Sequence, residues 1–492
     1  MIVGIDIGTQ SLKVAVTDRA FRVLGEAATT YRPQFPGPGR AEQDPALWEQ
    51  ALGPTIARAL ARADTAPVEV AALGICGQLD GCIAVDGDGR VLAPCLIWMD
   101  RRAGEEIADV SASLVRSRAG VVLDPSHMAA KIRWLKRHDP RAASAARFHQ
   151  PVSYLVERLT GAAVMDHALA STSMAYALDQ RGFDPELLKC FGIAAAELPA
   201  LAEAESCAGS LSSAGAELTG LAGGIPVAVG TGDDFSTPLG AGLLTPGTLE
   251  VAIGTGEVIG ALHARPVVDK GGLVETNAYP GGTFFLKNPG WLSGGAVEWL
   301  CDLLGIDDAQ AFDAEAAAAP AGADGVSFIP ALTGAMAPEW HAGARGCFYG
   351  LTPAHGRAHM ARALLEGCAF AMRDVAERLR DLGVVTDTLL LLGGGARSRV
   401  WTQMRVDILG LPAMVPDRVD TSPVGAAMLA AVAGGVIPDL HSAVELVRRE
   451  QRGSRIEPCA EHAGPYDEAY WRYRRLFDAL RPIFNTERLT QA

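Results

Sequence analysis

The chain has 492 residues, of which 49% are hydrophobic and 20% charged, so it has enough apolar material for large folded cores. A net charge of −14 argues against a general nucleic-acid or anionic-membrane binder, because both surfaces repel an acidic protein. A small-molecule ligand is therefore expected, with neither nucleic acid nor membrane as a partner.

Several features predict a cytoplasmic location. Nine cysteines form an odd number without a CxxC pair, which predicts reduced and mostly buried thiols. The start MIVGIDIGTQSLKVAV has no basic region and interrupts its apolar run with Asp6, so it predicts a strand rather than a signal peptide. The uncharged stretch 421–438 is rich in Ala and Gly and predicts a packed helix rather than a membrane span.

The first element is a hairpin that recurs later in the chain. Alternating apolar residues around Ile5 lead into a Gly8-Thr9 turn and a second strand, Leu12 to Thr17. The segment 248–263 repeats this pattern, with Gly254-Thr255 in the place of Gly8-Thr9. The repeat predicts an internal duplication, and hence two related α/β halves.

Other elements follow in chain order. We expect a strand over 69–75, a strand pair over 82–94 and helices over 143–161 and 361–383, the last ending at Gly383. The glycine-rich sequence TLLLLGGG predicts a strand over 388–395. Near the C-terminus, a helical stripe is expected to face the core: Tyr466, Tyr470, Tyr473, Phe477 and Leu480. Pro and Gly near residue 246 suggest domains over 1–246 and 247–455, with 456–492 forming a C-terminal helix of uncertain domain assignment.

Two glycine-bearing turns are candidate phosphate sites. In GIDIGTQSLK, the turn amides could hold phosphate oxygens while Asp6 binds Mg²⁺ and Lys13 adds positive charge. An ordinary hairpin is an equally good explanation of this motif alone. The similar segment AIGTGE favours phosphate binding, since two such turns facing each other across a cleft would clamp a polyphosphate.

Three glycines, Gly393 to Gly395, follow the apolar strand before a predicted helix. A backbone without side chains allows a nucleoside to approach a helix N-terminus closely. The sequence contains neither GxGxxG nor GxxxxGK[ST], so it supports neither a dinucleotide fold nor a P-loop. A tight strand-to-helix turn is the simpler alternative.

Together these segments resemble the FGGY family of carbohydrate kinases, especially its xylulokinase-like members. The matching segments occur in order along nearly the whole chain: GIDIGTQSLKV, GICGQLDG, IWMDRRA, YLVERLTG, VGTGDDFS, AIGTGE, ARGCFYGLTPAHG, ALLEGCAFAMRD and GGGARSRVWTQMRVDILG. The resemblance implies an α/β, two-domain, actin-like (ribonuclease H-like) ATPase fold. It also implies ATP and Mg²⁺ in an interdomain catalytic cleft, with the sugar bound on the first domain.

The resemblance assigns roles to individual residues. Asp233 corresponds to the catalytic base and, with Asp6, to the metal site. The nucleotide would be bound by Gly8, Thr9, Gln10, Lys13, Gly254, Thr255, Gly256, Gly393, Gly394, Gly395, Ala396 and Ser398. The sugar would be bound by Gln78, Leu79, Asp80, Trp98, Asp100, Asp233 and Asp234.

Two departures from the family pattern bear on the substrate. The usual GQMHG segment is GQLDG, so Asp80 stands where His is expected, and Asp234 stands where Asn usually follows the base. Carboxylates only accept hydrogen bonds, which suggests a different hydroxyl configuration in the substrate. We expect a pentulose kinase, with D-xylulose or a related ketose as substrate. The alternatives are a glycerol- or erythritol-type polyol kinase and a non-catalytic sugar-sensing ATPase; a homodimer is a family-level expectation.

Other motifs have simpler explanations. The segment VDGDGRV predicts a hairpin turn rather than a calcium loop, since it lacks the downstream Glu. His355 and His359 have the spacing of a metal pair but no evident third ligand. Arg101 and Arg102 suit a surface ion-pair cluster and a sugar pocket equally well.

Overall fold

The computed structural model describes residues 1–485. The chain forms two compact units, each with its own central sheet. The first unit combines Met1–Leu244, Thr276–Phe284 and Thr421–Gln451. The second contains Thr245–Glu275, Phe285–Asp420 and the chain from Arg452 onward.

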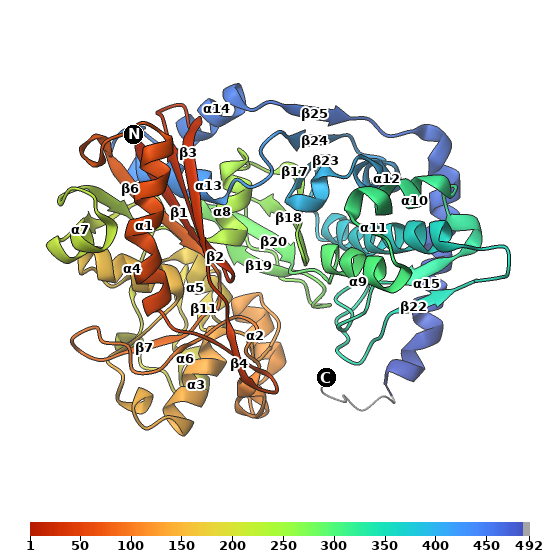
Figure 1. Ribbon diagram of the computed structural model, residues 1–492. Helices are drawn as coiled ribbons and strands as arrows, with labels where there is room; N and C mark the ends of the chain where they lie inside the picture. Colours follow the sequence, from red (N-terminus) through yellow and green to blue (C-terminus); the bar gives the residue numbers. More distant parts are fainter. Residues whose placement is uncertain (486–492) are drawn as a thin grey trace. The chain divides into compact units, whose positions relative to one another are not determined.

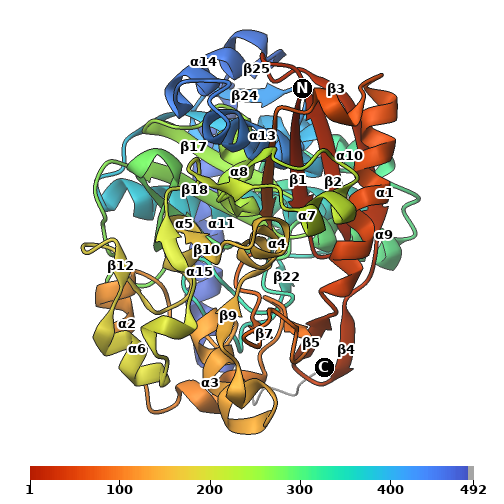
Figure 2. The same cartoon turned by 90° about the vertical axis from the view of Figure 1, so that its left-hand side faces the viewer.

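The main strands of the first unit are β1 (Ile2–Ile7), β2 (Ser11–Thr17), β3 (Val23–Thr30), β6 (Ala72–Gly77), β14 (Cys207–Ser210), β15 (Pro226–Ala228) and β16 (Thr231–Gly232). Its helices include α1 (Ala46–Arg62), α2 (Ala112–Ala119), α3 (Met128–His138), α4 (Pro151–Thr160), α5 (His167–Thr172), α6 (Pro185–Phe191), α7 (Ser213–Thr219), α8 (Asp233–Gly240), α13 (Ser422–Ala433) and α14 (Leu440–Glu450). The long helix α1 packs along β2 and β3, as Figures 1 and 2 show from two directions.

In the second unit the main strands are β17 (Gly247–Ile253), β18 (Glu257–His263), β20 (Phe284–Asn288), β23 (Thr386–Leu392), β24 (Ala413–Pro416) and β25 (Gly453–Ile456). The helices are α9 (Gly294–Leu304), α10 (Ala309–Ala318), α11 (Arg357–Asp381), α12 (Arg399–Leu409) and α15 (Ala460–Phe484). The predicted helix end at Gly383 lies just past α11, and this glycine has the left-handed φ of 85° that favours glycine.

The two sheets share one strand order. It is β14-β15-β6-β1-β2-β3 in the first unit and β25-β24-β23-β17-β18-β20 in the second. In each, an antiparallel hairpin pairs in parallel with a later strand, which is followed by one parallel and then one antiparallel neighbour. The predicted duplication of an α/β half is confirmed.

Two glycines let α13 lie directly on the first sheet (Figure 1). A Cβ on Gly4 would be 1.8 Å from the carbonyl oxygen of Pro423, and one on Gly74 would be 2.0 Å from that of Ala426. The small residues of α13 allow the same close approach from the helix side, and residues 422–431 are all buried. The prediction of a packed helix within 421–438 is confirmed.

This packing also explains why the units are discontinuous. The first break in the chain, after Leu244, lies close to the predicted boundary at 246. However, the segment Thr421–Gln451 belongs to the first unit, because α13 covers β1 and β6. The predicted domain 247–455 therefore does not form one compact unit. Of the predicted C-terminal segment 456–492, α15 is a helix, and residues 486–492 lie outside the described part of the chain.

One predicted helix is only partly correct. The segment 143–161 contains β9 (Arg147–His149), which pairs with β7 (Ile83–Val85), and only then α4. Pro151 is the first residue of α4, where a missing backbone N–H leaves no hydrogen bond unmade. The residue before a proline avoids the helical conformation, and Gln150 is extended.

The core predictions for the C-terminal helix and the cysteines largely hold. Tyr466, Tyr470, Tyr473 and Phe477 are buried along α15, while Leu480 is only half-buried. All nine cysteines are free thiols, and Cys207 is exposed. Across residues 1–485, no helix combines the length and the apolar character needed to cross a membrane.

Candidate active site

Three strands of the first unit end together at one edge of the sheet. In β6, Cys76 lies between Asp6 of β1 and Thr231 of β16, and Gly77 lies between Ile7 and Gly232. All three strands are parallel, so the residues that follow them meet at the same edge. These residues are the Gly8-Thr9 turn, the Gln78 segment and Asp233, which were predicted to form one site.

The Gly8-Thr9 turn is held by polar side chains from several segments. The Gly8 amide donates to the carbonyl oxygen of Ser11 at 2.9 Å, which closes the turn. Gln43 Nε2 donates to the Thr9 carbonyl oxygen at 2.6 Å, and Trp98 Nε1 donates to Thr9 Oγ1 at 2.9 Å. Gln10 is exposed at the tip.

Across this hairpin, Asp6 and Lys13 are directly paired. Lys13 Nζ lies 3.8 Å from Asp6 Oδ2, and the Asp6 side chain is only 6% exposed. Asp6 therefore presents one nearly buried carboxylate at the base of the turn, where it could accept a positive or hydrogen-bonding group of a ligand.

Asp233 is the first residue of α8 and follows β16 directly. The Asp234 amide donates to Asp233 Oδ1 at 3.0 Å, which orients one oxygen of the carboxylate. Both acids are half-buried, so their side chains are accessible. A Cβ on Gly232 would lie 2.4 Å from Leu79 Cδ2, so Leu79 packs against the residue before Asp233.

Electrostatics show that Asp6 and Asp233 act on the same region. Burial raises the pKa of the Cys76 thiol well above its usual range, and the negative charges of Asp6 and Asp233 raise it further. Burial and Asp6 likewise raise the pKa of Tyr31, whose hydroxyl donates to the Gly8 carbonyl oxygen at 2.7 Å. Two carboxylates therefore converge on the strand ends from different segments.

The predicted sugar residue Asp80 is deeply engaged by the protein. Thr172 Oγ1 donates to Asp80 Oδ1 at 2.9 Å, and His127 Nδ1 lies 3.1 Å from Asp80 Oδ2. Lys131 Nζ donates to the Asp80 carbonyl oxygen at 2.7 Å, and burial lowers the pKa of this lysine. Asp80 thus binds His127, a neighbour that sequence reasoning did not identify.

Gln78 and Trp98 are placed differently from Asp100. Gln78 Nε2 donates to Gln43 Oε1 at 2.7 Å and its Oε1 accepts from Thr9 at 3.5 Å, so it is part of the network around the turn. Trp98 is 48% exposed, which leaves much of its ring accessible. An indole face at this position can stack on an apolar sugar face.

Asp100 is fully buried and serves an internal ion pair. Arg102 Nη2 donates to Asp100 Oδ2 at 2.7 Å and to Glu42 Oε1 at 2.6 Å, and the Ala41 amide also donates to Asp100. This arrangement favours a supporting role for Asp100, which was predicted to bind the sugar. Arg101 instead pairs with Asp124 at the surface, so the two arginines have separate roles.

In the second unit, the turn at Gly254, Thr255 and Gly256 is exposed. The Gly254 amide donates to the Gly256 carbonyl oxygen at 2.8 Å, and the Gly294 and Gly295 amides at the start of α9 each donate back to this turn at 3.0 Å. The turn therefore has a fixed shape while its surface stays accessible, as a phosphate-binding turn requires.

The glycines 393–395 lie at the same end of the second sheet. Ala252 of β17 is paired with Leu392 of β23. The strand β23 therefore ends beside the turn at 254–256 and leads directly into Gly393. Gly393 has a φ of 78°, and a Cβ there would lie 2.5 Å from the Ile253 carbonyl oxygen. Only glycine fits this position.

The strand ends at Leu392, earlier than predicted, and a short 3₁₀ turn over Gly394–Arg397 precedes α12. Ser398 caps α12 by accepting from the Trp401 amide at 3.0 Å and donates to Asp313 at 2.8 Å. Ala396 is buried, so its backbone rather than its side chain is the part available to a ligand. The predicted nucleotide residues of this unit thus lie in two neighbouring turns.

A buried ion pair behind the Gly254 turn was not predicted. Arg405 Nη1 and Nη2 each donate to Glu257 at 2.6 Å, and Ser293 donates to the same carboxylate at 2.7 Å. Both charged side chains are fully buried. Glu257 directly follows the turn in the segment AIGTGE, and this acid within an apolar strand was the available signal.

Comparison with known proteins identifies the family. Residues 1–240 match the N-terminal domain, and residues 249–434 the C-terminal domain, of the FGGY family of carbohydrate kinases. The chain belongs to the FGGY family of carbohydrate kinases. This FGGY kinase is an ATP-dependent sugar kinase with a two-domain, actin-like α/β fold.

Individual relatives of this FGGY kinase differ in substrate. It is 34% identical to a glycerol kinase of Rhodospirillum centenum, over 92% of this chain and 93% of the relative. It is 30% identical to the xylulose kinase of Escherichia coli, over 98% of this chain and 100% of the relative. The crystal structure of xylulose kinase from Rhodospirillum rubrum matches with a TM-score of 0.89 at 29% identity, covering 98% of this chain and 99% of that one.

The donor set of this FGGY kinase fits Mg²⁺ bound together with phosphates. Within residues 1–485, no three His, Cys, Asp or Glu side chains are grouped so that they could hold a metal ion by themselves. Mg²⁺ in kinases retains waters and takes one or two carboxylates plus phosphate oxygens. Nearly buried Asp6 and half-buried Asp233 supply two carboxylates near the strand ends of the first unit.

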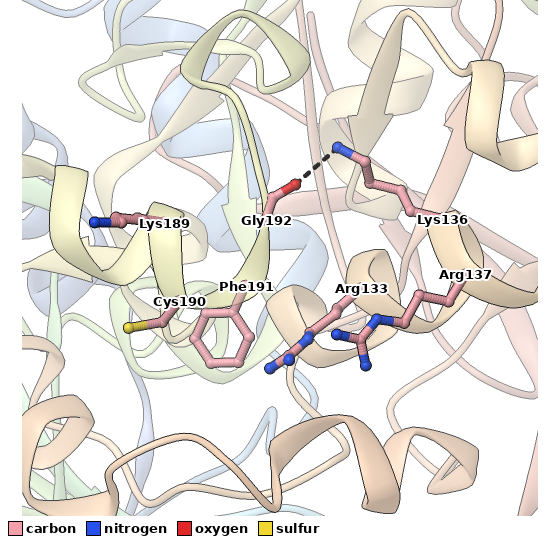
Figure 3. A pocket seen from close by; sticks show the side chains of 7 residues that line it. All are labelled: Arg133, Lys136, Arg137, Lys189, Cys190, Phe191 and Gly192. Atoms are coloured by element: carbon pink, nitrogen blue, oxygen red, sulfur yellow. Dashed lines mark hydrogen bonds between the residues drawn. The ribbon is translucent and has the colours of Figure 1, made fainter.

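A basic hollow elsewhere in the first unit has no part in this site (Figure 3). Its three residues from α3 are paired with acids: Arg133 with Asp109, Lys136 with Glu197 and Arg137 with Glu106. The other lining residues are Lys189, Cys190, Phe191 and Gly192. Because most of its positive charge is compensated, the hollow is a weak candidate for binding an anion.

Proposed function

We propose that this kinase transfers the γ-phosphoryl group of ATP to a hydroxyl of a pentulose, D-xylulose or a related ketose, with Mg²⁺ as the metal. The observation that carries the proposal is the position of Asp233. Asp233 starts α8 directly after β16, and the residue before it, Gly232, packs against Leu79. The charges of Asp6 and Asp233 both raise the pKa of the Cys76 thiol, so the two carboxylates lie near the same strand ends.

In this reaction Asp233 is the general base. A substrate hydroxyl oxygen attacks the γ-phosphorus, its proton passes to the Asp233 carboxylate, and the bond from the γ-phosphorus to the bridging oxygen breaks to release ADP. The N-terminus of a helix favours negative charge, and the Asp234 amide at 3.0 Å orients the accepting carboxylate.

Positioning and charge neutralisation account for most of phosphoryl-transfer catalysis. The amides of the turns at Gly8-Thr9 and at 254–256 would hold phosphate oxygens, and the backbone at 393–395 would lie against the adenosine. Bound Mg²⁺ would neutralise phosphate charge, with Asp6 and Asp233 as its protein ligands. Lys13 would add positive charge at the first turn.

The sugar would lie beside the exposed ring of Trp98 and within reach of Asp234. Gln78 and Leu79 would line it from the segment that follows β6. Asp80 would act in concert with His127, since its carboxylate is held by His127 and Thr172. A pair of this kind presents a different pattern of donors from the His that the family usually has at position 80.

A polyol kinase of the glycerol type is the second candidate. The observation in its favour is that the chain is 34% identical to a glycerol kinase and 30% identical to a xylulose kinase. The same base and phosphate turns would serve either substrate, so substrate choice has to be measured.

The test is sugar-dependent ADP release across ketopentoses, ketohexoses, tetritols and glycerol, with the rate in the absence of any acceptor as the baseline. We expect the highest kcat/KM with a ketopentose. A higher kcat/KM with glycerol or a tetritol would replace the pentulose proposal with the polyol one. No acceptor-dependent release, with ATP bound normally, would contradict both.

A further inference from the structure

The short helix α5 is attached at each end to a different part of the proposed site. Asp166 precedes it and caps it, accepting from the Leu169 amide at 3.0 Å and from the Ala168 amide at 3.2 Å. Thr231 Oγ1 donates to Asp166 Oδ2 at 2.7 Å. Asp166 and Thr231 are both almost fully buried. Thr231 lies two residues before Asp233.

The other end of α5 reaches the segment that contains Asp80. Thr172, its last residue, donates to Asp80 Oδ1 at 2.9 Å. Gln150 reinforces the link, since its Nε2 donates to the Leu169 carbonyl oxygen at 2.8 Å and its Oε1 accepts from the Asp80 amide at 2.8 Å. Asp80 has a φ of 56°, a left-handed conformation that these bonds help to hold.

We propose that Asp166 and Thr172 are positioning residues, and that α5 sets the distance between the base and the sugar-binding segment. The Asp166–Thr231 contact fixes the strand that leads into Asp233, and the Thr172–Asp80 contact fixes the segment proposed to bind the sugar. This inference rests on the proposed role of Asp233 as base.

The two ends should affect different kinetic constants. A small displacement of the base away from the attacking hydroxyl slows the chemical step, so loss of the Thr231 contact should lower kcat. A displaced Asp80 segment weakens sugar binding in the ground state as well, so loss of the Thr172 contact should raise KM for the sugar. A purely structural role would instead lower stability without separating kcat from KM.

The experiment compares Thr231→Val and Thr172→Val with Thr231→Ser and Thr172→Ser, which keep the hydroxyl. Thr219→Val is the matched control, because Thr219 is equally buried and its hydroxyl bonds only locally: it donates to the Gly215 carbonyl oxygen at 2.7 Å and accepts from the Leu221 amide at 3.3 Å. Each variant is first checked for native near-UV circular dichroism, so that rates refer to folded protein.

We expect Thr231→Val to lower kcat by about 10- to 100-fold with the sugar KM nearly unchanged, and Thr172→Val to raise the sugar KM about tenfold with a smaller loss in kcat. The serine variants should recover most of the wild-type values, and ATP affinity should stay constant throughout. The inference is overturned if both valine variants behave like Thr219→Val, or if they change kcat and KM in the same proportion.

A separate variant, Asp233→Asn, tells this failure apart from failure of the proposed function. An inactive Asp233→Asn enzyme with a fully active Thr231→Val enzyme would reject the positioning role alone. An active Asp233→Asn enzyme would reject the base assignment on which the inference rests.

Discussion

Asp234 is the residue from which a change of substrate preference is most directly expected. It is half-buried next to the proposed base, and its carboxylate can only accept hydrogen bonds, whereas an amide also donates. Asp234→Asn should therefore change the ratio of kcat/KM between two ketopentoses of opposite hydroxyl configuration by roughly tenfold, the worth of one hydrogen bond to a charged group.

The control for this change is Glu217→Gln, which removes an exposed carboxylate on α7. That variant should keep the wild-type order of substrates. If Asp234→Asn left every kcat/KM ratio in the acceptor panel unchanged, Asp234 would not contact the sugar.

Asp6 is expected to govern the response to metal. Its side chain is nearly buried beside the Gly8-Thr9 turn, with Lys13 Nζ at 3.8 Å. Asp6→Asn keeps the shape and removes the charge, so the Mg²⁺ concentration needed for half-maximal activity should rise by about 10- to 100-fold. A magnesium titration at saturating ATP measures this. An unchanged titration curve would remove Asp6 from the metal site.

At the scale of residues, sequence reasoning identifies groups whose role depends on local sequence. Asp233 at a helix start and the Gly8-Thr9 turn belong to short segments that specify their own geometry. The side-chain partners of Asp80 are instead distant in the chain, at His127 and Thr172. No local pattern predicts that pairing, nor the buried contact between Arg405 and Glu257.

At the scale of elements, the contact between α13 and the first sheet makes a prediction about stability. A Cβ on Gly4 would lie 1.8 Å from the Pro423 carbonyl oxygen, which is backbone and cannot move aside easily. Gly4→Ala should lower the free energy of unfolding by about 1–3 kcal/mol or more. Urea unfolding followed by circular dichroism measures the change.

Gly87→Ala is the control, since no atom lies within 4 Å of a Cβ at Gly87 and its φ is not positive. It should change the free energy of unfolding by less than about 0.5 kcal/mol. Equal effects of the two substitutions would show that close packing of α13 does not limit position 4.

The cap of α5 predicts a pH dependence of stability. Burial raises the pKa of Asp166 to about 7, opposed by hydrogen bonds from Thr231 and two amides, while Glu205 raises it further. In the unfolded chain the pKa of an aspartic acid is about 3.9. Between these values the folded state keeps a proton that the unfolded chain has lost, so this contribution to stability is present at low pH and is lost as the pH rises through 7.

The free energy of unfolding of wild type should therefore fall more steeply between pH 5 and pH 7 than that of Asp166→Asn, with a slope that approaches one proton in the lower part of this range. Urea unfolding at half-unit pH intervals tests this. Parallel profiles for the two proteins would place the Asp166 titration outside this range.

Elements with strong local signals are predictable, and those defined by tertiary pairing are less so. The two hairpins and α11 follow from apolar periodicity and glycine stops. The strand β9 is only three residues long and exists because it pairs with β7. The sequence around β9 resembles that of the following helix, which explains why a helix was predicted from residue 143 although α4 begins at Pro151.

At the scale of the whole molecule, the repeated hairpin predicts two related halves, and the shared strand order of the two sheets confirms them. The discontinuity of the units is not visible in the sequence. It arises because a late helix, α13, packs on β1 and β6, strands from the start of the chain. Boundary signals such as Pro and Gly mark turns, but not the unit to which a later segment returns.

The central claim, that Asp233 is the base of a sugar kinase, is tested most directly by acceptor-dependent ADP release from Asp233→Asn, measured beside its affinity for ATP. The account predicts a fall in kcat of about 10²- to 10⁴-fold with ATP affinity unchanged. Turnover within a few-fold of wild type with the best acceptor would contradict it.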